Sequence, residues 1–373
     1  MGICGCEPSY YLPEDLLSKK KLLAEDIDEA AKRAELFIDT EVDFKTAMYY
    51  KELSEEQRNR FDPMITGLHI GNMDCSNRLL EKLHLNRGVF TGVGEITVHK
   101  EVVDELLSHD WANLTDKVNP LLQLLFTCGV IGMPVVLHCD VGLCTAALED
   151  EPAYLADIKK LFSHEHARNT TIIWAHAGGI GRFVDVPAGY VEVLRTLLDD
   201  QTNPHLHIDL SWGVVAEKIV NDDFQLDNWA ELINQYPTRF IFGSDCLVPN
   251  TPEKWNSTYI KYEKLIVKLD AQAIDAVFTG NYERVFVEAR SKVREYEKTR
   301  LAEDFLKLNP YYNAPVIAVA TRPTYANPVT TAAGSSTSST SSTSSTSSTS
   351  STSSTSSTST AGAQELELEL EDS

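Results

Sequence analysis

Five short apolar runs in this chain each end in a residue that can bind a metal or transfer a proton. These residues are Glu95, His138, His176, Asp209 and Asp245, separated by steps of 43, 38, 33 and 36 residues. A helix-like stretch lies within each interval, and a strand, a helix and a return take about that length. The spacing therefore predicts an α/β fold of repeated βα units, a (β/α)8 barrel, with the five residues at the C-terminal ends of its strands.

Alternation along the strands predicts that the five candidates point inward. Residues two apart in a strand share a face. Between 205 and 211 one face is wholly apolar, and the other carries His207, Asp209 and Ser211. We expect the other four candidates to share an interior face with the residue two positions before each of them, namely Val93 for Glu95, Val136 for His138, Trp174 for His176 and Gly243 for Asp245.

Two histidines and two or more carboxylates at one barrel mouth suit a divalent metal, most naturally zinc, with manganese as the alternative. A metal held in this way activates water for attack, and the aspartate after the last strand could take its proton. A single histidine in an apolar strand is more often a core residue, and a single aspartate after Gly-Ser is more often a cap. The five together favour a site.

Six motifs extend this pattern over about residues 40–290. They are Arg-Phe-Asp-Pro-Met-Ile-Thr-Gly at 60–67, Gly-Val-Gly-Glu at 92–95, Pro-Val-Val-Leu-His at 134–138, Trp-Ala-His-Ala-Gly-Gly at 174–179, Arg-Phe-Ile-Phe-Gly-Ser-Asp at 239–245 and Gly-Asn-Tyr-Glu-Arg-Val-Phe at 280–286. In their order and combination the chain resembles the amidohydrolase superfamily, in particular its amidohydrolase-related branch. The resemblance implies a metal-dependent TIM-barrel enzyme.

The resemblance also implies roles for individual residues. His138 matches the fifth-strand metal ligand, and His176 matches the sixth-strand histidine. Asp245 matches the eighth-strand aspartate that binds metal and acts as acid–base, while Glu95 occupies the fourth-strand position of a bridging carboxylate or carboxylated lysine. Arg182, after Gly-Gly-Ile-Gly, could hold a substrate carboxylate or lie on a helix surface.

Asp209 is assigned to substrate binding only because it lies on the same face of its strand as the other polar residues.

One family element is missing, because no His-x-His pair precedes Glu95. Two segments have the His-x-His letters but do not fit the missing pair. His164-Glu165-His166 falls in a predicted helix or at its end, where side chains two residues apart point in different directions and cannot bind one metal. His205-Leu206-His207 lies at the start of a strand, which is the opposite end of the barrel from the site. Counting back from Asp245 makes 64–70 the third strand, so we expect a barrel that is incomplete at strands 1–2. Truncation, a partner or the N-terminal helix would account for the gap.

We expect four segments: an N-terminal helical segment over 1–60, an amidohydrolase-like barrel over 61–290, a C-terminal helix and irregular extension over 291–330, and a disordered Ser/Thr-rich and acidic tail over 331–373. The composition of the tail cannot offset its ordering entropy. The helix is expected at 291–308.

A net charge of −22 argues against nucleic acid and anionic membranes as partners. Seven scattered cysteines indicate a reducing compartment, which we take to be the cytoplasm. Lipid anchoring at Gly2, Cys4 and Cys6 is a minor alternative, because the sixth position lacks Ser or Thr. The expected partner is a small-molecule substrate. The sequence leaves open whether the chain forms a homo-oligomer.

The leading interpretation is a metal-dependent hydrolase acting on an amide, lactone or ester of a small carboxylated molecule, with Asp245 moving the proton. The alternatives are a non-oxidative decarboxylase of the same branch, and a degenerate barrel that binds a ligand or serves as a scaffold.

Overall fold

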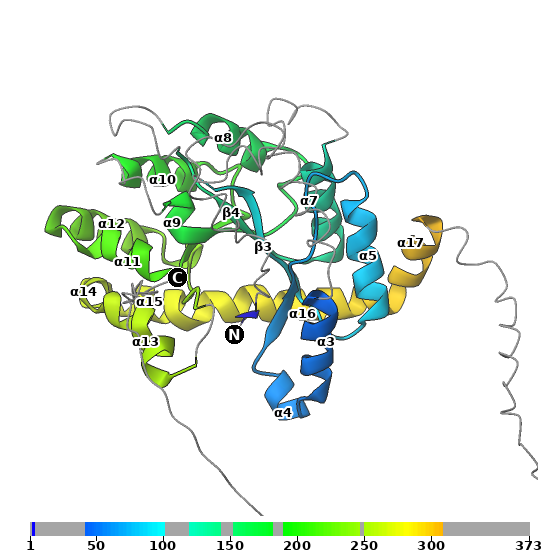
Figure 1. Ribbon diagram of the computed structural model, residues 1–373. Coiled ribbons are helices and arrows are strands. Elements are labelled where there is room, and N and C mark those ends of the chain that lie inside the picture. Colours follow the sequence, from blue (N-terminus) through cyan, green and yellow to red (C-terminus); the bar gives the residue numbers. More distant parts are fainter. Residues whose placement is uncertain are drawn as a thin grey trace, which may run out of the picture. The chain divides into compact units, whose positions relative to one another are not determined.

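The computed structural model describes residues 2–3, 42–100, 119–142, 152–181, 189–246 and 250–308. Their strands form one parallel sheet in sequence order, as the spacing of the apolar runs predicts (Figure 1). The strands are β1 (Gly2–Ile3), β2 (Asp62–Ile65), β3 (Gly92–His99), β4 (Val135–Cys139), β5 (Ile172–Trp174), β6 (Leu206–Leu210) and β7 (Phe240–Phe242). The sheet is an α/β arrangement compatible with part of a TIM barrel, and its six longer strands correspond to the expected strands three to eight.

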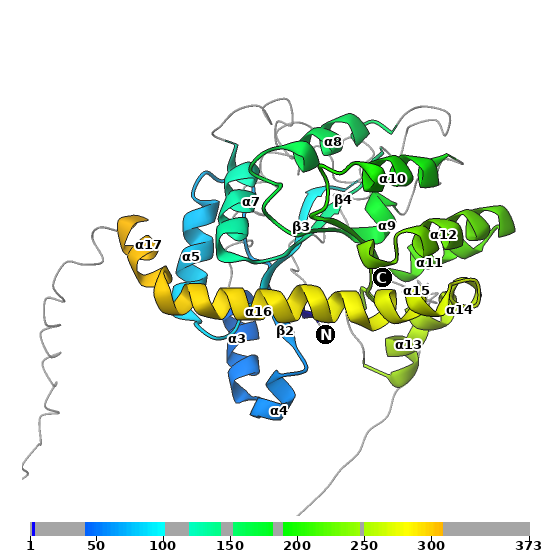
Figure 2. The same ribbon diagram turned by 180° about the vertical axis from the view of Figure 1, so that it is seen from behind.

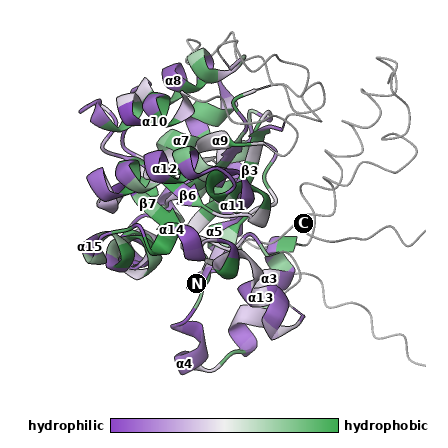
Figure 3. Cartoon of the chain, turned by 90° about the vertical axis from the view of Figure 1, so that its left-hand side faces the viewer, coloured by the Kyte–Doolittle hydropathy of each residue, from purple (hydrophilic) through white to green (hydrophobic). Residues whose placement is uncertain are grey.

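Helices fill the intervals between the strands, and α13 and the later helices follow β7. They are α3 (Val42–Glu52), α4 (Glu55–Arg58), α5 (Cys75–Leu85), α7 (Pro120–Ile131), α8 (Leu155–Ser163), α9 (Ala175–Gly179), α10 (Tyr190–Asp199), α11 (Gly213–Val220), α12 (Asp223–Gln235), η3 (Pro237–Arg239), α13 (Pro252–Lys261), α14 (Glu263–Ile266), α15 (Ala271–Asp275), the π-helical turn η4 (Ala276–Gly280), α16 (Asn281–Thr299) and α17 (Leu301–Leu308). In Figure 3, hydrophobic residues gather around the strands, whereas α4 is hydrophilic.

Each sheet face has its own set of buried side chains. The large core joins α5, α7, α8, α10 and α12 to one face, which we call the outer face and which carries Val135, Leu137 and Ile208. A separate cluster on the opposite, inner face contains Met64, Ile173 and Ile241, which pack with α16. Inner and outer positions alternate along β4, β5, β6 and β7, as the pleat requires.

Helix α16 fills the inner face at the level of this cluster. Val285 and Phe286 contribute to it directly. Further buried positions at Ala289 and Val293 continue the same stripe at helical spacing. The helix begins at Asn281, ten residues before the helix expected from the sequence, so the domain boundary expected at 290 lies inside it.

The same helix runs across the molecule as one long ribbon (Figures 1 and 2). Its side chains bond to β7 and to β2, which lie toward opposite edges of the sheet. The Asn281 side-chain amide donates to the carbonyl oxygen of Phe240 in β7 at 2.7 Å. Nine residues further on, the Arg290 guanidinium donates to both carboxylate oxygens of Asp62 in β2, at 2.9 and 2.8 Å. Among the described residues no pairing joins β7 back to β1 or β2, and α16 spans that gap. The sequence analysis considered the N-terminal helix or a partner for this role.

Asp62 is the buried anchor of this arrangement. Its side chain is 1 % exposed and also accepts hydrogen bonds from the hydroxyls of Tyr282 and Thr91. We expect Asp62→Asn to lower the free energy of unfolding by about 3 kcal/mol, because a buried ion pair is broken and one of its donors is left unpaired. Urea unfolding would measure the loss.

Asp227→Asn is the matched control. Asp227 pairs with Lys268 on the surface, where both side chains are substantially exposed, and a change of less than about 0.5 kcal/mol is expected there. Equal effects of the two substitutions would contradict the anchoring role of Asp62.

Several predictions fall outside the described residues: the helix over 14–36, the lipidation cysteines Cys4 and Cys6, Arg182 and the Ser/Thr-rich tail. Within the described part of the chain, no helix combines the length and the apolar character that crossing a membrane requires.

Candidate metal centre

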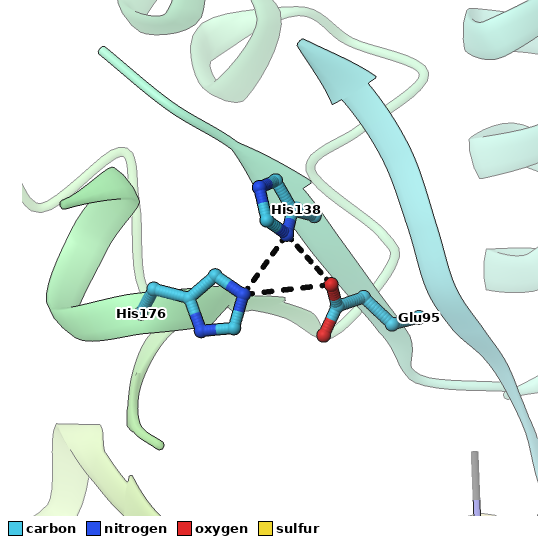
Figure 4. Close-up of side chains that lie close together, drawn as sticks. All are labelled: Glu95, His138 and His176. Carbon is cyan, nitrogen blue, oxygen red and sulfur yellow. Dashed lines mark hydrogen bonds and ion pairs between the residues drawn. The ribbon is translucent and has the colours of Figure 1, made fainter. Parts of the chain in front are cut away.

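Three of the residues predicted as metal ligands converge on the inner face of the sheet (Figure 4). His138 Nδ1 lies 2.7 Å from Glu95 Oε1 and 2.9 Å from His176 Nε2. The distance from His176 Nε2 to Glu95 Oε1 is 3.5 Å. The three donor atoms come from three successive strands and lie within 4.8 Å of one another. His138 and His176 lie at the ends of β4 and β5, but Glu95 lies in the middle of β3, so its expected place at a strand's C-terminal end is wrong. Both histidines are buried, and the Glu95 side chain is 26 % exposed.

A β-bulge turns Glu95 toward His138 and His176. Val93 is paired with Val135, and Ile96 with Leu137, so β3 advances three residues while β4 advances two. Both pairs belong to the outer core. The prediction that Glu95 shares its face with Val93 is therefore wrong, because the extra residue reverses the alternation between them.

His176 reaches the site by a different departure from regular structure. Trp174 lies on the outer face, where its ring contacts Phe162 and its indole N–H donates to the carbonyl of Cys139. Simple alternation would therefore put His176 on the outer face as well. Instead the backbone turns left-handed at His176 (φ 60°) and Ala177 (φ 52°), which redirects the imidazole. Non-glycine residues rarely adopt this conformation, and such residues concentrate at functional sites.

Gly94 permits the bulge that orients Glu95. Its φ is +134°, and a Cβ at this position would lie 2.7 Å from the Val136 carbonyl oxygen. We expect Gly94→Ala to cost about 3 kcal/mol of unfolding free energy and to weaken metal binding, because strand β3 must shift. Denaturant unfolding and zinc titration measure the two effects.

Gly189→Ala offers the control, because a Cβ there meets no atom within 4 Å. A Gly94→Ala protein with the stability and zinc affinity of the Gly189→Ala protein would refute this role for Gly94.

In each imidazole, the ring nitrogen that points away from the three converging donor atoms also faces a polar group. His176 Nδ1 lies 3.2 Å from Ser211 Oγ, and His138 Nε2 lies 3.2 Å from Asp140 Oδ1. Sequence reasoning assigned no role to Ser211 or Asp140. Ser211 was visible only as a polar residue in phase with Asp209. Asp140 follows His138 by two residues, and residues two apart in a strand share a face. That spacing was the only sequence signal that the two side chains could meet.

The charges of the site are strongly coupled. Burial disfavours the charged form of His138, but the carboxylates of Asp140 and Glu95 outweigh it and raise the pKa of His138 to about 9. For His176, the effect of burial is likewise exceeded by Glu95, so its pKa is also raised. Burial opposes ionisation of Glu95, yet the two imidazoles hold its pKa well below the ordinary value. The site therefore favours protonated imidazoles at His138 and His176 beside an ionised Glu95 carboxylate.

Two further candidates line the same region without joining the three-atom cluster. Asp209 is buried in β6, and its carboxylate lies against the backbone of Gly243. Burial raises the pKa of Asp209 to about 7. Asp245, two residues beyond Gly243, is half-buried, and burial together with the charge of Glu95 raises its pKa to about 6. Asp245 is thus within electrostatic range of the cluster, but it is not among the three converging donors.

The three donors fit a divalent metal. A tetrahedral zinc ion with ligands at about 2.1 Å holds its donor atoms roughly 3.4 Å apart, and two histidines with one glutamate form a known catalytic zinc set. The separations here are 2.7, 2.9 and 3.5 Å. Movement of a few tenths of an ångström at each side chain would accommodate the ion. A His-x-His pair is not needed to reach three protein ligands, which leaves one position open for water or substrate.

A scan of models of known protein families finds no match, and a search of curated proteins finds none either. Two solved structures are similar to parts of the chain. One, from Pseudomonas putida, is provisionally described as a 2-pyrone-4,6-dicarboxylic acid hydrolase; it has a TM-score of 0.41, 16 % identity, and coverage of 65 % of this chain and 76 % of its own. The other is 5-carboxyvanillate decarboxylase LigW from Sphingomonas paucimobilis, with a TM-score of 0.41, 13 % identity, and coverage of 71 % and 77 %. Likeness at this level carries no argument about activity, and the resemblance to the amidohydrolase superfamily stays a prediction.

Proposed function

We propose that the chain is a metal-dependent hydrolase acting on an amide, lactone or ester of a small carboxylated molecule. Glu95, His138 and His176 would hold the cation, for which zinc is the first choice and manganese the second. The observation that carries the proposal is the convergence of Glu95 Oε1, His138 Nδ1 and His176 Nε2. Packing does not require three such groups from three neighbouring strands to meet.

A divalent cation bound there would supply a Lewis acid that polarises the substrate carbonyl and acidifies a water molecule. The remaining work falls to side chains of the protein. Asp245, with a pKa near 6, is ionised at neutral pH and can take a proton from the attacking water. It can then return that proton to the leaving group.

Asp209 and Arg182 are proposed to bind the substrate. With a pKa near 7, Asp209 is protonated in part of the molecules at neutral pH and can donate a hydrogen bond to a substrate oxygen. Arg182 would pair with a substrate carboxylate through its planar guanidinium, as the sequence analysis suggested.

A specific observation also favours the second candidate, a non-oxidative decarboxylase. That reaction needs a proton donor for the carbon that loses CO₂, and a carboxylic acid that remains protonated near pH 7 can serve. Asp209 meets this condition because burial raises its pKa to about 7. The two reactions therefore share the metal site and differ in whether Asp209 protonates carbon.

Product analysis separates the candidates. Purified protein would be loaded with zinc or manganese and incubated with lactones, esters and amides of dicarboxylic acids, and with aromatic carboxylates. Metal-dependent release of acid without CO₂ supports the hydrolase, and release of CO₂ supports the decarboxylase. A protein that binds metal yet yields neither product would instead fit the ligand-binding or scaffold interpretation, and the proposal would fall.

A further inference from the structure

We propose that Asp140 is a positioning residue that holds His138 with its Nδ1 aimed at the metal. The inference rests on the proposed function, and it adds a residue for which neither the strand spacing nor the motifs gave a role. Asp140 directly follows β4 and lies two residues beyond His138.

The geometry at His138 uses both ring nitrogens. Nδ1 faces Glu95 and His176, whereas Nε2 lies 3.2 Å from Asp140 Oδ1. Both side chains of the His138–Asp140 pair are nearly inaccessible, at 2 % and 3 % exposure. A neutral imidazole has one N–H and one lone pair. A carboxylate 3.2 Å from Nε2 favours the proton on that nitrogen by electrostatic attraction, which leaves the lone pair on Nδ1, where the ion would bind.

Asp140 is itself held in place by the neighbouring strand. Its backbone N–H donates to the carbonyl of His99 at 3.1 Å. Its own carbonyl accepts a hydrogen bond from His99 Nδ1 at 2.7 Å. His99 is fully buried at the end of β3, so both backbone groups of Asp140 are tied to the strand that also carries Glu95. One strand, β3, thus carries a proposed metal ligand at its middle and, at its end, the support for the carboxylate that orients the next one.

The second histidine provides an internal comparison. His176 Nδ1 faces the hydroxyl of Ser211, a neutral group. A buried carboxylate attracts an imidazole N–H more strongly than a neutral hydroxyl does, because its full charge acts at short range in a medium of low dielectric constant. Asp140 is therefore expected to affect metal affinity more than Ser211 does.

The test is a zinc titration of the full chain in competition with a chromophoric chelator. Asp140→Asn keeps the shape of the side chain and removes its charge, and we expect the zinc Kd to rise by about 10- to 100-fold. Ser211→Ala is expected to raise it less. Asp62→Asn is the matched control: it also replaces a buried aspartate and destabilises the fold, but it lies outside the metal cluster, and its Kd should remain within about threefold of wild type.

The outcomes divide cleanly. An Asp140→Asn Kd within about threefold of wild type overturns the positioning role, as does an equal loss in Asp62→Asn, which would indicate a general effect of destabilisation. If Asp140→Asn does not fold, Asp140→Ser is titrated under the same criterion. Failure of the wild-type protein to bind zinc or manganese would overturn the proposed function itself. Tight binding by both wild type and Asp140→Asn would overturn this inference alone.

Discussion

Replacing His138 and His176 together by alanine is expected to weaken zinc binding on the order of 1,000-fold or more, because it removes two of three ligands. The wild-type protein should hold one ion per chain. Elemental analysis after gel filtration would give the stoichiometry, and chelator competition would give the affinity.

The chain contains a matched control for this double substitution. His164 and His166 also stand two residues apart, and their rings lie 5.1 Å from each other just beyond the end of α8. They form no part of the described metal cluster. His164→Ala with His166→Ala should leave the zinc stoichiometry at one. Loss of zinc in this control, or its retention in the His138 and His176 variant, would contradict the assignment of the ligands.

Asp245→Asn is expected to lower kcat by about 100- to 10,000-fold on whichever substrate the product screen identifies, because general acid–base catalysis is lost. Metal content should stay near one ion, since Asp245 is not among the three converging donors. Steady-state kinetics and elemental analysis of the same preparation would measure both quantities. Loss of the ion together with activity would instead make Asp245 a fourth ligand, as the family resemblance implies.

The wild-type rate should also depend on pH through this carboxyl group. Burial, together with the charge of Glu95, raises the pKa of Asp245 to about 6 in the absence of metal. A general base works only when deprotonated, so activity should rise with pH and level off above that value. A bound cation favours the carboxylate and would move the midpoint downward. A rate that falls as pH increases from 5 to 7 would contradict the role of Asp245 as a base.

The sequence was sufficient for the order of the sheet and for the three residues that converge in it. Regular steps between Glu95, His138 and His176 predicted successive parallel strands, and the pairings of β3, β4 and β5 confirm that order. Chemistry and spacing were enough here because parallel strands bring all their C-terminal ends to one side of a sheet.

The orientation of two ligands could not be obtained in the same way. Strict alternation gave the wrong face for Val93 and for Trp174, and hence a wrong reason for placing Glu95 and His176 inside. A bulge at Gly94 and a left-handed turn at His176 correct both. Neither departure has a periodic signal, because each depends on how a single residue meets the neighbouring strand.

An opening in the sheet at the first two strands was predicted, but not the helix that spans the opening between β7 and β2 in the described part of the chain. Asn281 and Arg290 lie nine residues apart on one helix and bond to β7 and β2. Their partners are more than 40 and more than 200 residues away in sequence. Contacts of such long range arise from the tertiary arrangement of α16 against the sheet, and local patterns do not encode them.

The location of the ion tests the central claim most directly. Crystals of zinc-loaded protein would be measured at the zinc absorption edge for an anomalous difference map. The account predicts one strong peak at about 2.0–2.2 Å from each of Glu95 Oε1, His138 Nδ1 and His176 Nε2. A map without a peak between these three atoms, or with zinc bound only elsewhere on the chain, would contradict it.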